Sequence, residues 1–177
     1  MGQLMTLIAN IFRAILGKQE PSLISNNTGE NMERSAREII TLEEYLTSSG
    51  AYPERAKSPE LTEEFLTNAR KLLVNVNPFL YELGIFKVKV SSGFRPSYVN
   101  ERVKNAAKRS LHMQCLAVDI LDDANQTIAT TCAANPDLMR KYNLFLESPA
   151  HTKGKNTNWI HLQYNSLKDR PSRIFIP

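Results

Sequence analysis

The sequence predicts an α+β fold in which a small antiparallel sheet packs against helices. Two observations support this class: apolar residues recur with a helical period up to about Gly84, and short strand-like segments follow without regular alternation of strands and helices. With 177 residues the chain is about the length of one domain, which is enough to bury a sizeable core. No apolar run reaches the roughly 18 residues that a membrane-spanning helix needs.

Two N-terminal segments precede the predicted domain. Residues 1–17 place their apolar side chains on one helical face, which predicts an amphipathic helix that ends at Gly17. The segment lacks the cationic start and cleavage site of a secretory signal, and we expect residues 4–15 to dock on the domain, on a partner protein or at a membrane surface. Residues 18–34 are polar without periodicity and read as a linker, so the folded domain is expected over residues 35–177.

Helices are predicted in the first part of the domain. Thr41 and Glu44 form a capping box for a short helix that closes at Gly50. Ser58-Pro59 is expected to open a longer helix, and Pro78 to kink or end it. Its apolar positions keep the helical period: Leu61, Phe65, Leu66, Ala69, Leu72, Leu73 and Val76.

Strands are predicted in the second part. The alternation of apolar residues and lysines over 86–90 indicates a half-buried strand, and a short polar helix is expected near 97–107. Residues 125–142 suit one or two helices broken at Pro136. Three further strands are expected, at 116–121, 143–148 and 158–164.

Composition excludes some classes of function. The net charge of +4 is spread over mixed-sign segments, and no basic stripe interleaves with aromatic residues, so we expect no nucleic-acid partner. The two cysteines, Cys115 and Cys132, form neither a disulfide framework nor a C-x-x-C pair.

The chemistry of the chain concentrates around two of its three histidines. His112 and His161 stand in apolar surroundings, and Asp119 lies inside an apolar strand pattern, so each needs a partner if it is buried. A histidine of this kind can be a core residue satisfied by a backbone carbonyl. Alternatively, two imidazoles and one carboxylate form a common ligand set for catalytic zinc. Spacing alone leaves both interpretations open.

Three motifs in order carry a resemblance. Ser110, His112, Ala117 and Asp119 match S-x-H-x-x-G-x-A-x-D, "SSGFRP" matches S-G-[YF]-R, and "NWIHLQ" matches a final W-[VI]-H. Over residues 39–177 the chain thereby resembles the zinc D-alanyl-D-alanine carboxypeptidase and peptidoglycan endopeptidase family, which includes phage endolysins and has a hedgehog-like fold. The similarity is greatest to phage and prophage members.

The resemblance implies roles for individual residues. His112, Asp119 and His161 would bind one Zn²⁺. Arg95 would hold either the substrate carboxylate or the oxyanion that develops on the attacked carbonyl. Ser110 would hydrogen-bond to substrate or cap local backbone. The implied substrate is a peptidoglycan stem peptide.

The chain departs from the family pattern at two positions. Cys115 replaces the motif glycine, so we expect the backbone there to do without a glycine conformation or the strand to differ slightly, with the thiol a core residue. Asn158 stands where many members carry a carboxylate base, and an amide cannot take a proton from water. We expect Asn158 to contact the substrate instead. Glu147 is the expected base, and His151, in the following loop, a second candidate and a rim residue that contacts substrate.

The alternative function is a catalytically inactive module with a binding or structural role in a phage particle or cell envelope. Asn158 and the amphipathic segment at 4–15 motivate this alternative.

Overall fold

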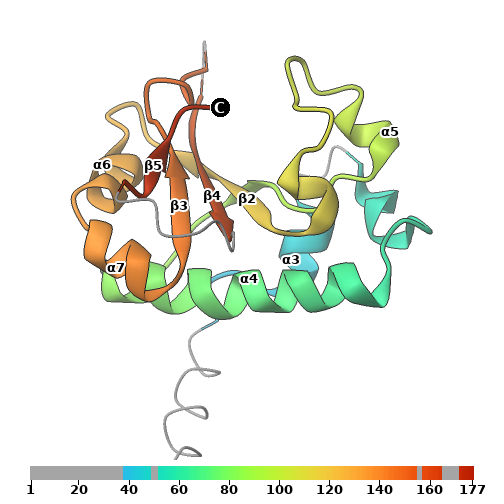
Figure 1. Ribbon diagram of the computed structural model, residues 1–177, viewed down its shortest axis with the longest axis horizontal. Coiled ribbons are helices and arrows are strands. Elements are labelled where there is room, and N and C mark those ends of the chain that lie inside the picture. The colour runs from blue at the N-terminus through green and yellow to red at the C-terminus, as the bar shows by residue number, and fades with distance from the viewer. Residues whose placement is uncertain (1–37, 49–51, 155–156, 165–171) are drawn as a thin grey trace, which may run out of the picture. The chain divides into compact units, whose positions relative to one another are not determined.

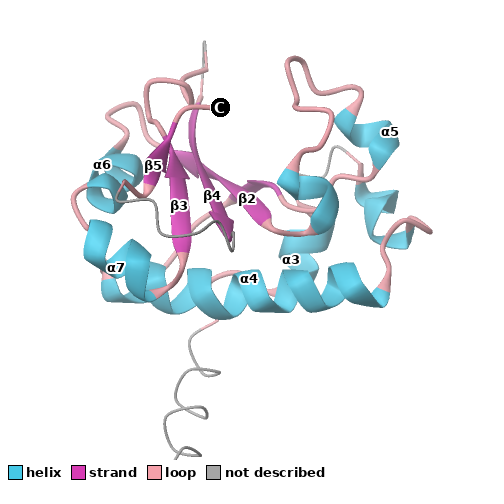
Figure 2. Ribbon diagram, in the orientation of Figure 1, coloured by secondary structure: helices cyan, strands magenta, loops and turns pink. Residues whose placement is uncertain are grey.

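A five-stranded sheet, in the order β1-β2-β4-β3-β5, forms the centre of the fold (Figure 2). Neighbouring strands are antiparallel, except that β5 runs parallel to β3. The predicted fold class is therefore confirmed. The strands are β1 (Val90–Ser92), β2 (Ala117–Asp122), β3 (Leu144–Glu147), β4 (Asn158–Tyr164) and β5 (Ile174–Phe175).

The structure is a computed structural model that describes residues 38–48, 52–154, 157–164 and 172–177. These residues belong to one compact unit, Arg34–Pro177. The helix predicted over 1–17, the linker over 18–34 and the predicted helix end at Gly50 lie outside the described residues.

Helices pack below and beside the sheet, with the long α4 running beneath the strands (Figure 1). Its buried residues form one core cluster with the apolar residues of β2, β3 and β4. No helix of the described residues has the length and hydropathy to cross a membrane. The helices are α3 (Leu42–Thr47), η1 (Pro53–Lys57), α4 (Glu63–Glu82), α5 (Ser97–Asn100), η2 (Leu111–Gln114), α6 (Thr127–Ala133) and α7 (Pro136–Lys141).

The long helix begins later than predicted and continues past Pro78. It begins at Glu63, because the Thr62 side chain accepts a hydrogen bond from the Phe65 amide and caps the first turn. Pro78 does not end it, and the helix continues to Glu82. Proline leaves the carbonyl four residues earlier without its helical donor, but that residue, Val74, is 63% exposed, so water can replace the donor. Helical residues before and after Pro78 are buried, and their packing stabilises the helix across the proline.

Two other predicted elements are shorter in the structure. The strand expected at 86–90 begins only at Val90 and continues to Ser92, with an irregular register against β2. Phe86 lies outside the ladder, is 65% exposed and packs on Tyr81 at a ring-centroid distance of 5.2 Å, whereas Val88 and Val90 pack on the core. The helix expected at 97–107 covers only Ser97–Asn100 and gives way to turns.

Gly93 occupies a position where no side chain fits. A Cβ built there would lie 1.9 Å from the backbone oxygen of Tyr45. Tyr45 is itself 0% exposed. The amide of Gly93 also donates to the buried Ser48 hydroxyl at 2.8 Å, which fixes the loop against α3. This glycine therefore allows close approach of two backbones.

Gly93→Ala should destabilise the domain by about 3 kcal/mol or more, because a backbone oxygen cannot rotate out of the way. Gly84→Ala is the control: Gly84 has φ +75° with no atom near the added Cβ, so only the left-handed conformation, about 1–2 kcal/mol, opposes the change. Urea unfolding of both variants would measure this; equal losses would contradict the close-approach argument.

Candidate metal centre

One line of cross-strand neighbours runs through Ser92, Asp119, His161 and Glu147. Ser92 pairs with Asp119, Asp119 pairs with His161, and Glu147 pairs with Phe175. Leu146 is opposite Leu162, so the next residue, Glu147, lies beside His161. Because partners in a sheet point to the same face, the line runs across all five strands on the face away from the core.

His112 reaches this line from outside the sheet. It lies in η2, whose first turn is capped by Ser110, and is 1% exposed. The helix ends at Cys115 in the left-handed conformation, φ 57°, and the chain then enters β2. The expectation that the backbone does without a glycine conformation at Cys115 is therefore wrong: cysteine adopts that conformation at a cost of about 1–2 kcal/mol. The thiol is fully buried in the core.

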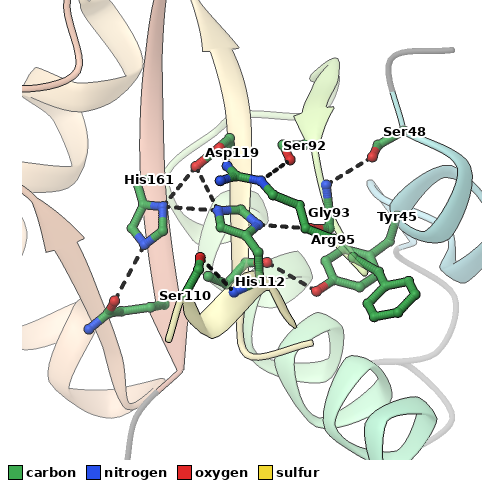
Figure 3. A network of polar contacts seen from close by, with 12 residues as sticks. Tyr45, Ser48, Ser92, Gly93, Arg95, Ser110, His112, Asp119 and His161 are labelled. Carbon is green, nitrogen blue, oxygen red and sulfur yellow. Dashed lines mark hydrogen bonds and ion pairs between the residues drawn. The ribbon is translucent and has the colours of Figure 1, made fainter. Parts of the chain in front are cut away.

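His112, Asp119 and His161 converge on one point (Figure 3). His112 Nε2 lies 3.2 Å from Asp119 Oδ1 and 3.2 Å from His161 Nδ1, and His161 Nδ1 lies 2.8 Å from Asp119 Oδ1. Tetrahedral zinc with bonds near 2.0–2.1 Å requires donor atoms about 3.3 Å apart. The two separations from His112 Nε2 match this spacing, and the separation of 2.8 Å between His161 Nδ1 and Asp119 Oδ1 is shorter.

The outer nitrogen of each imidazole faces an oxygen. His112 Nδ1 lies 2.8 Å from the carbonyl of Gly93, and His161 Nε2 lies 3.3 Å from Oε1 of Gln163. These acceptors hold the ring protons on the outer nitrogens, so the lone pairs of both inner nitrogens point toward Asp119. Three lone-pair atoms at these distances repel one another unless a metal ion or a proton lies between them. The donor set therefore fits a metal cation.

Burial and mutual contact shift the pKa values of all three groups. Burial lowers the pKa of His112 to about 4, and Arg95 adds to the effect. Burial alone would raise the pKa of Asp119, but His112 and His161 hold it well below its usual range. Burial alone would lower the pKa of His161, but its hydrogen bond to Asp119 and the charge of Glu147 raise it. Of the three groups, His161 is thus the one whose surroundings favour uptake of an additional proton.

Arg95 orients the carboxylate of this cluster. Its Nη2 donates to Asp119 Oδ2 at 2.5 Å, and its Nε donates to Ser92 Oγ at 2.8 Å. The Arg95 amide donates to the carbonyl of His112 at 3.1 Å, which ties the arginine turn to η2. Asp119 therefore offers one oxygen to the histidines and the other to Arg95.

Glu147 stands beside the cluster on β3. It is half-buried, and burial, together with the charge of Asp119, raises its pKa. His151 is exposed in the next loop and acts on Glu147 through its charge. The positions suit the base and rim roles expected for these two residues, which remain predictions.

Asn158 and Ser110 make local contacts. The Asn158 amide donates to the carbonyls of Asp123 and Ala124 at 2.9 and 3.3 Å, and strand alternation places it on the other face from His161. Ser110 Oγ accepts from the His112 amide at 3.4 Å, which is the capping alternative. The absence of a carboxylate at 158 thus removes nothing from the cluster, and these contacts lend no support to a substrate role for Asn158.

A pocket of about 380 Å³ opens next to the cluster and is lined in part by Arg95 and Asp119. Tyr52 and Trp159 give it aromatic walls. On the opposite side Phe175 packs its ring 6.0 Å from that of His161. Sequence reasoning missed Gln163, Tyr52 and Phe175 as neighbours of the site. Alternation along 158–164 places Gln163, like Trp159, on the face of His161 and could have indicated it.

Arg95→Met should destabilise the metal-free domain by about 3 kcal/mol, because it leaves the buried Asp119 carboxylate without its cation. The side chains of this pair are 11% and 9% exposed, whereas those of Arg140 and Asp137 are 46% and 93% exposed. Arg140→Met should therefore cost less than about 1 kcal/mol. Urea unfolding in the presence of a chelator compares the two; similar small losses would show that Arg95 contributes little to holding Asp119.

Comparison with known proteins adds an independent finding. The family model for Peptidase M15 matches residues 40–163, which include the whole His112–Asp119–His161 cluster. No curated protein and no solved structure matches the chain. The match covers more than half of the sequence, and the chain therefore belongs to the Peptidase M15 family.

Proposed function

We propose that the protein is a zinc-dependent peptidase that cleaves peptidoglycan stem peptides, with Glu147 as its general base. Family membership implies a peptide substrate. The observation that carries the proposal is the pairing of β2, β4 and β3, which places Asp119, His161 and Glu147 side by side beneath His112. A candidate metal-binding group and a carboxylate that can accept a proton thus lie side by side on one face of the sheet.

Zinc suits the three donors because two imidazoles and a carboxylate leave one coordination position open. Once bound, the ion would supply an acidified water molecule and polarise the substrate carbonyl. His112 and His161 would hold it through Nε2 and Nδ1, and Asp119 through Oδ1.

Glu147 would accept the proton of the attacking water and deliver it to the leaving amine. Its raised pKa makes the carboxylate a stronger base toward the attacking water. The neighbouring Phe175 and the half-buried setting limit competition from bulk water. His151, charged when protonated, stands close enough to influence this exchange.

Arg95 would bind the negative charge of the substrate. It lines the pocket beside Asp119, and a guanidinium carries five donors, of which Asp119 and Ser92 engage two. The pocket between Tyr52 and Trp159 would receive the adjoining part of the peptide. The oxygen that Arg95 contacts is either the carbonyl oxygen under attack or a substrate carboxylate.

The inactive-module alternative was motivated by the lack of a base at position 158 and by the amphipathic segment at 4–15. Glu147 lies in register with His161, and its charge acts on that ring, so the enzyme proposal is favoured. The membrane or protein docking proposed for residues 4–15 remains a separate proposal.

Glu147→Gln should reduce hydrolysis of purified peptidoglycan by about 10²–10⁴-fold while zinc binding is retained, because the amide cannot accept a proton. His112→Ala should abolish both. Glu82→Gln is the control, since Glu82 lies away from the cluster and pairs with Lys141. Release of stem-peptide amines and zinc content measure the outcomes. Undiminished hydrolysis by the Glu147 variant would rule out its role as base, and no hydrolysis by zinc-loaded wild type would favour the inactive module.

The wild-type chain should bind one zinc ion with an affinity that falls as the pH is lowered. Below the raised pKa of His161 a proton occupies that ring and must leave, so the affinity should fall by about tenfold per pH unit. His161→Ala should lose binding, whereas His151→Ala, which alters the exposed third histidine, should not. Competition with a chelator at pH 8.0 to 5.5 tests this; affinity independent of pH would contradict the assignment of His161.

A further inference from the structure

We propose that Gln163 is a positioning residue for the metal centre: its side-chain carbonyl accepts the Nε2 proton of His161 and thereby turns Nδ1 toward the metal. This inference rests on the proposed metal-binding function of the cluster. It concerns a residue that does not itself touch the metal.

The geometry assigns this role to one side chain. Gln163 follows His161 by two residues on β4, so both point to the same face of the sheet. Its Oε1 lies 3.3 Å from His161 Nε2, and the residue is 8% exposed. Its cross-strand partners are Ala117 on β2 and Phe145 on β3, both buried. The amide is therefore enclosed on both sides and its direction is restricted.

The two histidines of the cluster are oriented by different means. His112 is held by a backbone carbonyl, that of Gly93, which no substitution of a side chain removes directly. His161 is held by a side chain, so its orientation depends on the identity of residue 163. His161 also presents Nδ1 inward, whereas His112 presents Nε2. A half-turn of the His161 ring about its Cβ–Cγ bond would move Nδ1 away from Asp119.

Loss of the acceptor would have two consequences. The ring of His161 could adopt orientations in which Nδ1 no longer faces the cluster, and the Nε2 proton would lose its acceptor inside the fold. Outer-shell partners of metal-binding histidines typically contribute about 10–100-fold to metal affinity. A carboxylate in place of the amide would preserve the acceptor oxygen and raise the basicity of the ring.

The test compares zinc dissociation constants of the full chain at pH 7.5, measured by chelator competition. Gln163→Met, of similar length but without the acceptor, should weaken binding about 10–100-fold. Gln163→Glu should bind at least as tightly as wild type. Gln163→Asn, whose side chain is one methylene shorter, should weaken zinc binding as Gln163→Met does. The asparagine variant takes the place of Gln163→Met if the methionine variant fails to fold. Gln126→Met is the matched control, since Gln126 is equally buried at 8% and donates to Pro149 instead of a histidine.

The outcomes separate this inference from the proposed function. Wild-type affinity in both Gln163→Met and Gln163→Asn would overturn the role of Gln163 while leaving zinc binding intact. If Gln163→Glu bound zinc as weakly as Gln163→Met, the inference would also be overturned. A residue that only packs against its neighbours would give the same result with and without the acceptor oxygen. Failure of the wild type to bind zinc would instead refute the metal function on which the inference rests.

Discussion

The antiparallel pairing of β2 with β4 is the constraint on which the candidate centre depends. It sets Asp119 directly opposite His161, and continuous pairing from Ala117 to Asp122 leaves no freedom to shift one against the other. A slip of one residue would move either side chain to the core face. On that core face Val118, Ile120, Ile160 and Leu162 are fully buried, so the apolar core itself fixes the register of the polar line.

The remaining parts of the site are arranged around this pair from outside the sheet. The turn that contains Gly93 supplies a carbonyl for His112 and places Arg95 against Asp119. Ser48 on the α3 side accepts from the Gly93 amide, and the buried Arg55 donates to the Phe94 carbonyl. Helix packing and ligand orientation are thus connected through a few backbone groups.

Much of the fold and of the candidate site was predictable from sequence, and the parts that were not predictable have physical explanations. The fold class, the capping box at Thr41 and the break before Pro136 follow from local patterns, and the structure has them. The need of the histidines and the aspartate for buried partners followed from their apolar surroundings, whereas their assembly into one metal cluster was expected only from the resemblance. Local preference at Pro78 left open whether α4 would end there or continue, and tertiary burial on both sides of the proline decides for continuation. The left-handed Cys115 likewise depends on a tertiary position that a one-dimensional pattern does not contain. Strand alternation could have placed Gln163 on the face of His161, but it does not contain the contact between the two side chains.

The shortest strand lies at one edge of the sheet and belongs to the part of the chain beyond the family match at residue 163. Its Phe175 pairs with Glu147 and touches the ring of His161, but none of the three converging donors lies on it. A two-residue edge strand opens at lower free energy than the central strands. Fraying of β5 would therefore hydrate Glu147, the proposed base, while the three proposed metal ligands keep their geometry, so separate parts of the sheet govern the environment of the one and the positions of the others.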